Sequence, residues 1–213
     1  AGGNVFLSPD VASPPKVSFE NLPQTASHRP TDVKGKPHQV HARMISDHDK
    51  VAPGQTFRLG IHLEQDSGWH TYWKSPGVVG KPTVISWKLP EGVTASPYQY
   101  PAPAYFEQSG LVSIGYEDEV LLFSDVTIPE SMPIGPTVFE ADVEWLVCKE
   151  SCIPGTAKLS LPLVVADSQK SSYVSVFDHY AQYLPTPILD VKEFRVETAL
   201  SASGIKPEEI FQF

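Results

Sequence analysis

The sequence has only two cysteines, no long apolar run and fewer basic than acidic residues. Lysine and arginine number 16 against 25 aspartates and glutamates, which gives a net charge of −9. A chain without a basic stripe is poorly suited to neutralise phosphates, which argues against a nucleic-acid-binding protein. No stretch of about 18 apolar residues occurs, so the sequence predicts no membrane-spanning helix in this chain.

Proline and glycine, by contrast, are abundant, with 21 and 14 residues. Prolines spread along a chain argue against long helices and favour short strands separated by turns. The hydrophobic content of 41% supports a real core, and 213 residues allow one domain of ordinary size and part of a second.

Alternating apolar residues predict strands. The clearest case is 56–63, where Phe57, Leu59, Ile61 and Leu63 fall on one face. Similar patterns cover 83–89, 120–128, 137–147 and 157–165. Several short strands separated by turn signals predict an all-β fold, an immunoglobulin-like antiparallel β-sandwich over residues 36–166. The aromatic cluster between them is interpreted as packing at the core or its edge, with a structural histidine; it comprises Trp69, His70, Tyr72 and Trp73.

The segments on either side of these strands have a different character. Residues 1–35 are rich in proline, serine and glycine, which predicts a flexible or loosely docked arm. Residues 167–186 are expected to form a helix and a linker, because apolar residues there recur at helical spacing and Pro185 ends the run; they are Tyr173, Val174, Phe177, Tyr180, Ala181 and Leu184. Residues 187–213 are expected to start a second β module or to form a C-terminal extension.

The two cysteines, Cys148 and Cys152, are separated by Lys149–Glu150–Ser151. On a straight strand, residues at this spacing are roughly 13 Å apart, whereas a disulfide needs Cα atoms about 4.4–6.8 Å apart. The pair can therefore close only across a turn. Because β-prone residues lie on both sides, we expect residues 149–151 to be a three-residue hairpin loop with the cysteines facing each other at its base.

Three roles remain open for this pair. A disulfide across five residues stabilises a fold by only about 2 kcal/mol in the chain-entropy model, so a redox role gains weight over a structural staple. Lys149 would lower a thiolate pKa and Glu150 would oppose it, so both are candidates for pKa tuning. A Cu(I) site that adds a histidine or Met44 is a second role, and an inert disulfide in a non-catalytic immunoglobulin-like interaction module is a third. Two cysteines without further ligands fall short of a zinc site.

A series of ordered motifs resembles a known family. The motifs are Asp66–Gly77, Trp87–Gly92, Tyr100–Pro103, Gly115–Val120 and Trp145–Pro154. In this order they are similar to the periplasmic N-terminal region of the DsbD-like protein-disulfide reductases, and most to the ScsB branch, over about residues 38–165. The spacing of the cysteines departs from the better-known DsbD branch, which has a longer insertion between them.

The resemblance implies a fold, a reaction and partners. It implies an immunoglobulin-like domain in the bacterial periplasm, part of an inner-membrane reductase, whose cysteine pair cycles between dithiol and disulfide without another cofactor. A thioredoxin-like domain of the same reductase would donate electrons, and periplasmic thioredoxin-fold proteins would accept them. Cys148 would be the partner-linked sulfur and Cys152 would resolve the mixed disulfide. A cap loop with an aromatic shield would comprise Tyr105, Phe106 and Glu107. The ScsB likeness also raises copper tolerance as a context.

Overall fold

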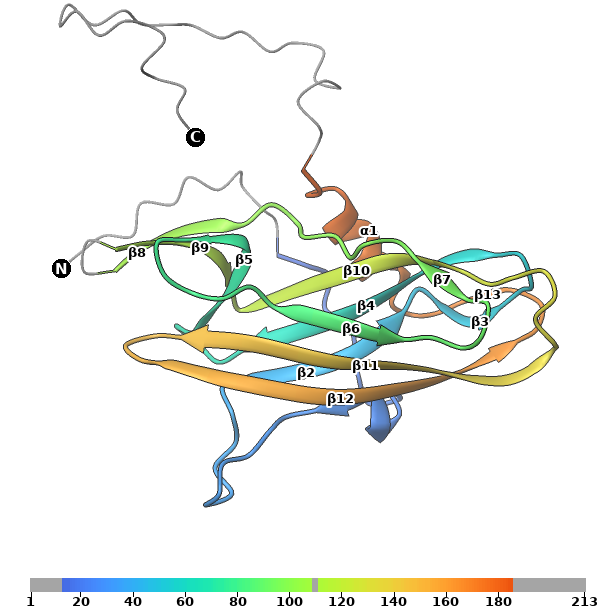
Figure 1. Cartoon of the computed structure of the whole chain (residues 1–213), viewed down its shortest axis with the longest axis horizontal. Helices are drawn as coiled ribbons and strands as arrows, with labels where there is room; N and C mark the ends of the chain where they lie inside the picture. Colours follow the sequence, from blue (N-terminus) through green and yellow to red (C-terminus); the bar gives the residue numbers. More distant parts are fainter. Residues whose placement is uncertain (1–12, 109–110, 186–213) are drawn as a thin grey trace, which may run out of the picture.

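Two sheets face each other across one apolar core (Figure 1). The structure is a computed structural model and describes residues 13–108 and 111–185. The first sheet has five strands in the order β1–β2–β4–β10–β7. Their bounds are β1 Ser27–His28, β2 Val40–Ser46, β4 Thr56–Gln65, β7 Thr94–Ala95 and β10 Glu119–Thr127.

The second sheet has eight strands in the order β13–β3–β12–β11–β5–β9–β8, with β6 also paired to β11. The short β3–β12 pairing is parallel, and the other pairings are antiparallel. The predicted antiparallel sandwich is therefore confirmed. The bounds are β3 His48–Val51, β5 His70–Gly77, β6 Val84–Lys88, β8 Ala104–Gln108, β9 Leu111–Glu117, β11 Gly135–Cys148, β12 Cys152–Val165 and β13 Gln169–Lys170.

The core forms because apolar residues alternate along the strands. The inward residues of β4 that the sequence predicted are all at most 2% exposed; they are Phe57, Leu59, Ile61 and Leu63. Phe57 meets Phe139 of β11 edge to face, with ring centroids 5.5 Å apart. This contact joins the two sheets, since each ring belongs to a different one.

The predicted helix forms as α1, Val174–Ala181, and lies on the outer side of the five-stranded sheet (Figure 1). The Phe177 ring is fully buried and meets Phe123 of β10, with centroids 5.7 Å apart. Val176 and Tyr180 are also buried. The helix is thus a third layer that closes the outer face of this sheet.

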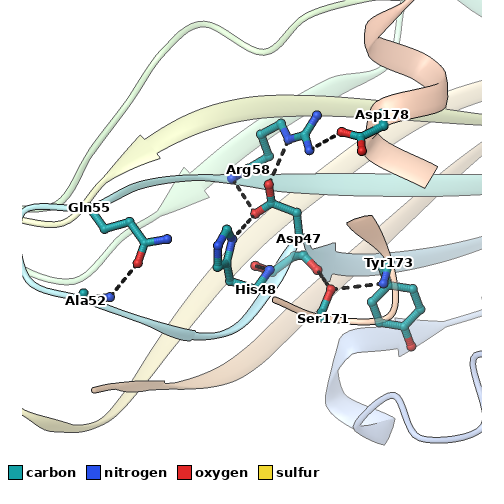
Figure 2. Close-up of polar contacts among 9 residues, drawn as sticks. Asp47, His48, Ala52, Gln55, Arg58, Ser171, Tyr173 and Asp178 are labelled. Atoms are coloured by element: carbon teal, nitrogen blue, oxygen red, sulfur yellow. Dashed lines mark hydrogen bonds and ion pairs between the residues drawn. The ribbon is translucent and has the colours of Figure 1, made fainter. Parts of the chain in front are cut away.

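A polar network centred on the buried Asp47 links the helix to the strands (Figure 2). The Asp47 carboxylate lies between β2 and β3 and accepts hydrogen bonds from Arg58 N (2.9 Å), Arg58 Nε (2.8 Å) and His48 Nδ1 (2.7 Å). Arg58 Nη2 then donates to Asp178 of α1 at 2.7 Å. These charge-assisted bonds link α1 to β4 through Arg58, with the Asp178 end of the link exposed to solvent.

The described part of the N-terminal segment lies against the sandwich. It contains the short helix η1, Gln24–Ala26, and β1 pairs with β2. Ala26 is fully buried, and the Phe19 ring lies 4.4 Å from the guanidinium carbon of Arg43. Apolar residues of this proline-rich segment therefore pack against the sandwich. The expected β module at 187–213 lies outside the described residues. Within 13–108 and 111–185, no helix has both the length and the apolar character of a membrane span.

Candidate functional site

Strands β11 and β12 form one long hairpin that ends at the two cysteines. Their register runs from Gly135↔Val165 to Cys148↔Cys152 without a shift. Residues 149–151 form the turn, in which Lys149 N donates to the Ser151 carbonyl oxygen at 3.2 Å. Cys148 and Cys152 form a disulfide with their Cα atoms 4.1 Å apart. The three-residue loop with facing cysteines, predicted from the sequence, is confirmed.

The two cysteines differ in their access to solvent. Cys148 is only 3% exposed, whereas Cys152 is exposed. The hydroxyl oxygen of Tyr72, a residue of β5, lies 3.9 Å from Cys152 Sγ and flanks this sulfur on one side. A partner can therefore reach Cys152 far more easily than Cys148. This burial favours the opposite order from the one that the resemblance implied, in which Cys148 was the partner-linked sulfur.

The cysteines belong to a row of paired residues that crosses four strands. Cys148 pairs with His70 of β5, and His70 pairs with Glu117 of β9. Directly paired residues of neighbouring antiparallel strands point to the same face of a sheet. The adjacent Val147 is fully buried in the core. The row of Glu117, His70, Cys148 and Cys152 therefore lies on the face of the sheet that points away from the core.

Burial sets the protonation of the groups around the disulfide. It lowers the pKa of His70, which is 7% exposed, so the imidazole is neutral at pH 7. Burial raises the pKa of Tyr72, although a hydrogen bond with Ser113 opposes this. The pKa of Glu117 is raised by burial first and by Asp118 second. The sulfurs thus lie beside an uncharged phenol and an uncharged imidazole.

A loop after β5 covers the ring of Tyr72. A Cβ at Gly80 would come within 2.3 Å of the Tyr72 ring, and Gly80 has φ of +115°, so only glycine fits this position. Val78 N donates to the Val112 carbonyl oxygen at 3.2 Å and joins the loop to β9. Strands β8 and β9 lie at the same end of the sandwich as the β11–β12 turn (Figure 1). Tyr72 is therefore held firmly beside Cys152.

The segment predicted as the cap loop forms strand β8. Tyr105 is half-buried and pairs with Ile114, while Phe106 and Glu107 pair through their backbones with Ser113 and Val112. The side chains of Phe106 and Glu107 lie outside the described part of the structure. The β8–β9 hairpin is close to the site through β5, and its capping role stays a prediction.

The two candidates for pKa tuning lie in the turn itself. Lys149 Nζ donates to the Ser67 carbonyl oxygen at 3.5 Å, which turns its ammonium group toward the loop before β5. Glu150 is exposed to solvent. Their effect on a thiolate in the reduced state stays a prediction.

Met44 is not placed to complete a Cu(I) site with the two cysteines. Met44 is fully buried on β2 and pairs with Ile61 in the core, whereas the cysteines lie on the outer face of the other sheet. Among the described residues, no group of three or more histidine, cysteine, aspartate or glutamate side chains is arranged to hold a metal ion.

Comparison with known proteins fits this geometry. The sequence profile described as "Thiol:disulfide interchange protein DsbD, N-terminal" matches residues 41–163, a range that includes both cysteines. The chain belongs to this family. The predicted resemblance to DsbD-like reductases is thereby confirmed, and none of the curated proteins compared matches the chain.

Solved structures add evidence on the fold. The N-terminal periplasmic domain of ScsB from Proteus mirabilis matches with 18% identity and a TM-score of 0.55, over 75% of this chain and 60% of that one. Two weaker matches follow. A family 123 glycoside hydrolase from Clostridium perfringens has 10% identity and a TM-score of 0.34, over 61% of this chain and 27% of that one. The yeast GGA1 GAE domain has 12% identity and a TM-score of 0.32, over 64% of this chain and 98% of that one. The ScsB match shows that this chain has the fold of that domain.

Sequence reasoning missed His70 and Tyr72 as members of the site. Both were interpreted as packing residues, yet they lie on the cysteine-bearing face of β5, while Trp69 and Trp73 pack against the core. Alternation within 69–73 already separates these two pairs. What the sequence does not show is that β5 lies next to the end of β11, because that pairing joins residues far apart in the chain.

Proposed function

We propose that this chain is a periplasmic thiol–disulfide exchange domain of a DsbD/ScsB-type reductase. The Cys148–Cys152 pair accepts two electrons from a thioredoxin-like domain of the same reductase and passes them to disulfides of periplasmic thioredoxin-fold proteins. Family membership supports the type of chemistry. The observation that carries the proposal is a disulfide at a hairpin tip with one exposed and one buried cysteine.

The exposed Cys152 is the sulfur that exchanges with partners in this proposal. A partner must approach along the S–S axis to attack a disulfide, and reactivity follows exposure. Cys152 is the exposed cysteine of the pair, and its turn projects from the end of the sandwich (Figure 1). The buried Cys148 can then reach only the neighbouring sulfur, so it resolves the mixed disulfide.

A pair of single-cysteine variants tests this assignment. Cys148→Ser keeps the exposed thiol and Cys152→Ser keeps the buried one, so each is the matched control of the other. The probe is a thioredoxin that retains only its exposed cysteine, activated as a mixed disulfide with thionitrobenzoate. We expect Cys148→Ser to release thionitrobenzoate at least about tenfold faster than Cys152→Ser.

Two results would count against the proposal. Equal rates, or a faster reaction of Cys152→Ser, would contradict the role of Cys152. A wild-type disulfide that resists reduction by a thioredoxin dithiol would instead favour the inert interaction module with a structural disulfide.

A further inference from the structure

The row across β9, β5, β11 and β12 places an imidazole between a carboxyl group and the buried thiol of the site. The order of paired positions is Glu117, His70, Cys148 and Cys152. Directly opposite residues have Cβ atoms about 4.5–5.5 Å apart in antiparallel pairs. In other cysteine sites, a thiol nucleophile is activated by a neighbouring base that a third, often acidic, group orients.

Cys148 needs a proton acceptor more than Cys152 does. The thiolate, not the thiol, attacks a disulfide, and a buried thiol ionises less readily than an exposed one. Cys148 is 3% exposed, so water has little access to remove its proton. Cys152 is exposed and can lose its proton directly to solvent.

The charged and titratable groups around His70 leave the imidazole as the suitable base. On its own strand, Tyr72 meets His70 edge to face with centroids 5.2 Å apart, but burial keeps the phenol protonated. Lys149, in the turn, carries an ammonium group with no lone pair to accept a proton. Glu150 is exposed. Glu117, with Asp118 next to it, pairs with His70 on the side away from Cys148, so the imidazole lies between this carboxyl group and the thiol.

We propose that His70 accepts the proton of Cys148 when Cys148 resolves the mixed disulfide; this rests on the proposed function. The Cys148 S–H bond breaks and His70 takes the proton. The Cys148 thiolate attacks Cys152 Sγ, so the Cys148–Cys152 bond forms and the bond from Cys152 to the partner sulfur breaks. The partner leaves as a thiolate and takes up the proton, and two electrons have passed from the dithiol to the partner.

The reaction of the fully reduced chain with 5,5′-dithiobis-(2-nitrobenzoate) separates the two steps. The first thionitrobenzoate is released when Cys152 attacks the reagent, at a rate proportional to reagent concentration. The second is released when Cys148 resolves the mixed disulfide, at a rate independent of it. We expect His70→Gln to slow the second phase at pH 7 by at least about tenfold and to leave the first unchanged.

The pH profile distinguishes a base from a structural residue. In the wild type, the second phase should reach a plateau near neutral pH, whereas in His70→Gln it should rise with each pH unit up to the thiol pKa. His179→Gln is the matched control, because His179 also has a pKa lowered by burial but lies on α1; it should behave as the wild type. His70→Asn is the second variant if His70→Gln fails to fold.

The outcomes separate this inference from the proposed function. A second phase with the same rate and pH profile in wild type and His70 variants would overturn the role of His70 alone. A wild-type chain with no concentration-independent second phase would overturn the exchange cycle itself.

Discussion

Reduction of the disulfide should cost the domain little stability. The bond closes a loop of five residues, from Cys148 to Cys152, for which the chain-entropy model gives about 2 kcal/mol, against about 4.7 for a loop of 100 residues. The rest of the hairpin does not depend on this bond, because β11 and β12 pair continuously from Gly135↔Val165 and their inward residues lie in the core. A domain that cycles between dithiol and disulfide must stay folded in both states.

Urea denaturation with and without dithiothreitol measures this cost. With a slope of about 2 kcal/mol per molar urea, a loss of about 2 kcal/mol moves the midpoint down by about 1 M. The double variant Cys148→Ser/Cys152→Ser is the control; it should match the reduced wild type and should not respond to dithiothreitol. Unfolding on reduction, or a loss of about 4 kcal/mol or more, would refute the reasoning and mark a structural disulfide.

Three further changes test other parts of the structure. Asp47→Ala removes a carboxylate that accepts three hydrogen bonds and should lower the unfolding free energy by about 3 kcal/mol in urea titrations. Its control is Asp66→Ala, which removes one partner of an exposed ion pair and should lower the unfolding free energy by at most about 1 kcal/mol. Gly155→Ala should lower the melting temperature, because its Cβ would come within 2.4 Å of the Trp145 ring. Burial first, and then Arg43, lowers the pKa of His41 from an ordinary 6.5 to about 4. Between these values the unfolded chain binds a proton at His41 that the folded chain does not, so the unfolding free energy should fall as pH drops from about 6.5 toward 4. The fall should be smaller in His41→Gln.

Each of these has a result that would contradict it. Equal losses in the two aspartate variants would mean that the buried Asp47 carboxylate in Figure 2 stabilises the fold no more than an exposed ion pair does. A melting temperature of Gly155→Ala equal to that of the wild type would show that the Trp145 ring moves aside freely. An identical pH dependence in wild type and His41→Gln would show that another group titrates in that window.

Local patterns were enough to predict much of the fold. Alternation at 56–63 placed Phe57 and Leu59 in the core, and the helical spacing from Tyr173 predicted α1. The hairpin turn was predicted from the two β-prone segments that flank residues 149–151. The pairing of Cys148 with Cys152 was predicted because the sequence has no other cysteine. These features depend on residues close in sequence, for which periodicity and loop length are informative.

The rest of the site depends on pairing between distant segments. Nothing in the sequence places His70 beside Cys148, since the register of β5 on β11 is set by the tertiary packing of both strands. The order of the two cysteines also could not be read from spacing, because burial of Cys148 depends on how β5 and its neighbours cover the end of β11. Segment 105–107 was predicted as a loop and is a strand, β8, because it finds a partner in β9.

The reduction potential of the Cys148–Cys152 pair tests the central claim most directly. It is measured by equilibrating the chain with glutathione or dithiothreitol buffers and labelling free thiols. Exchange predicts a potential of about −200 to −270 mV, the range of thioredoxins and glutaredoxins. A potential below about −300 mV would contradict the exchange function and mark the bond as a structural disulfide.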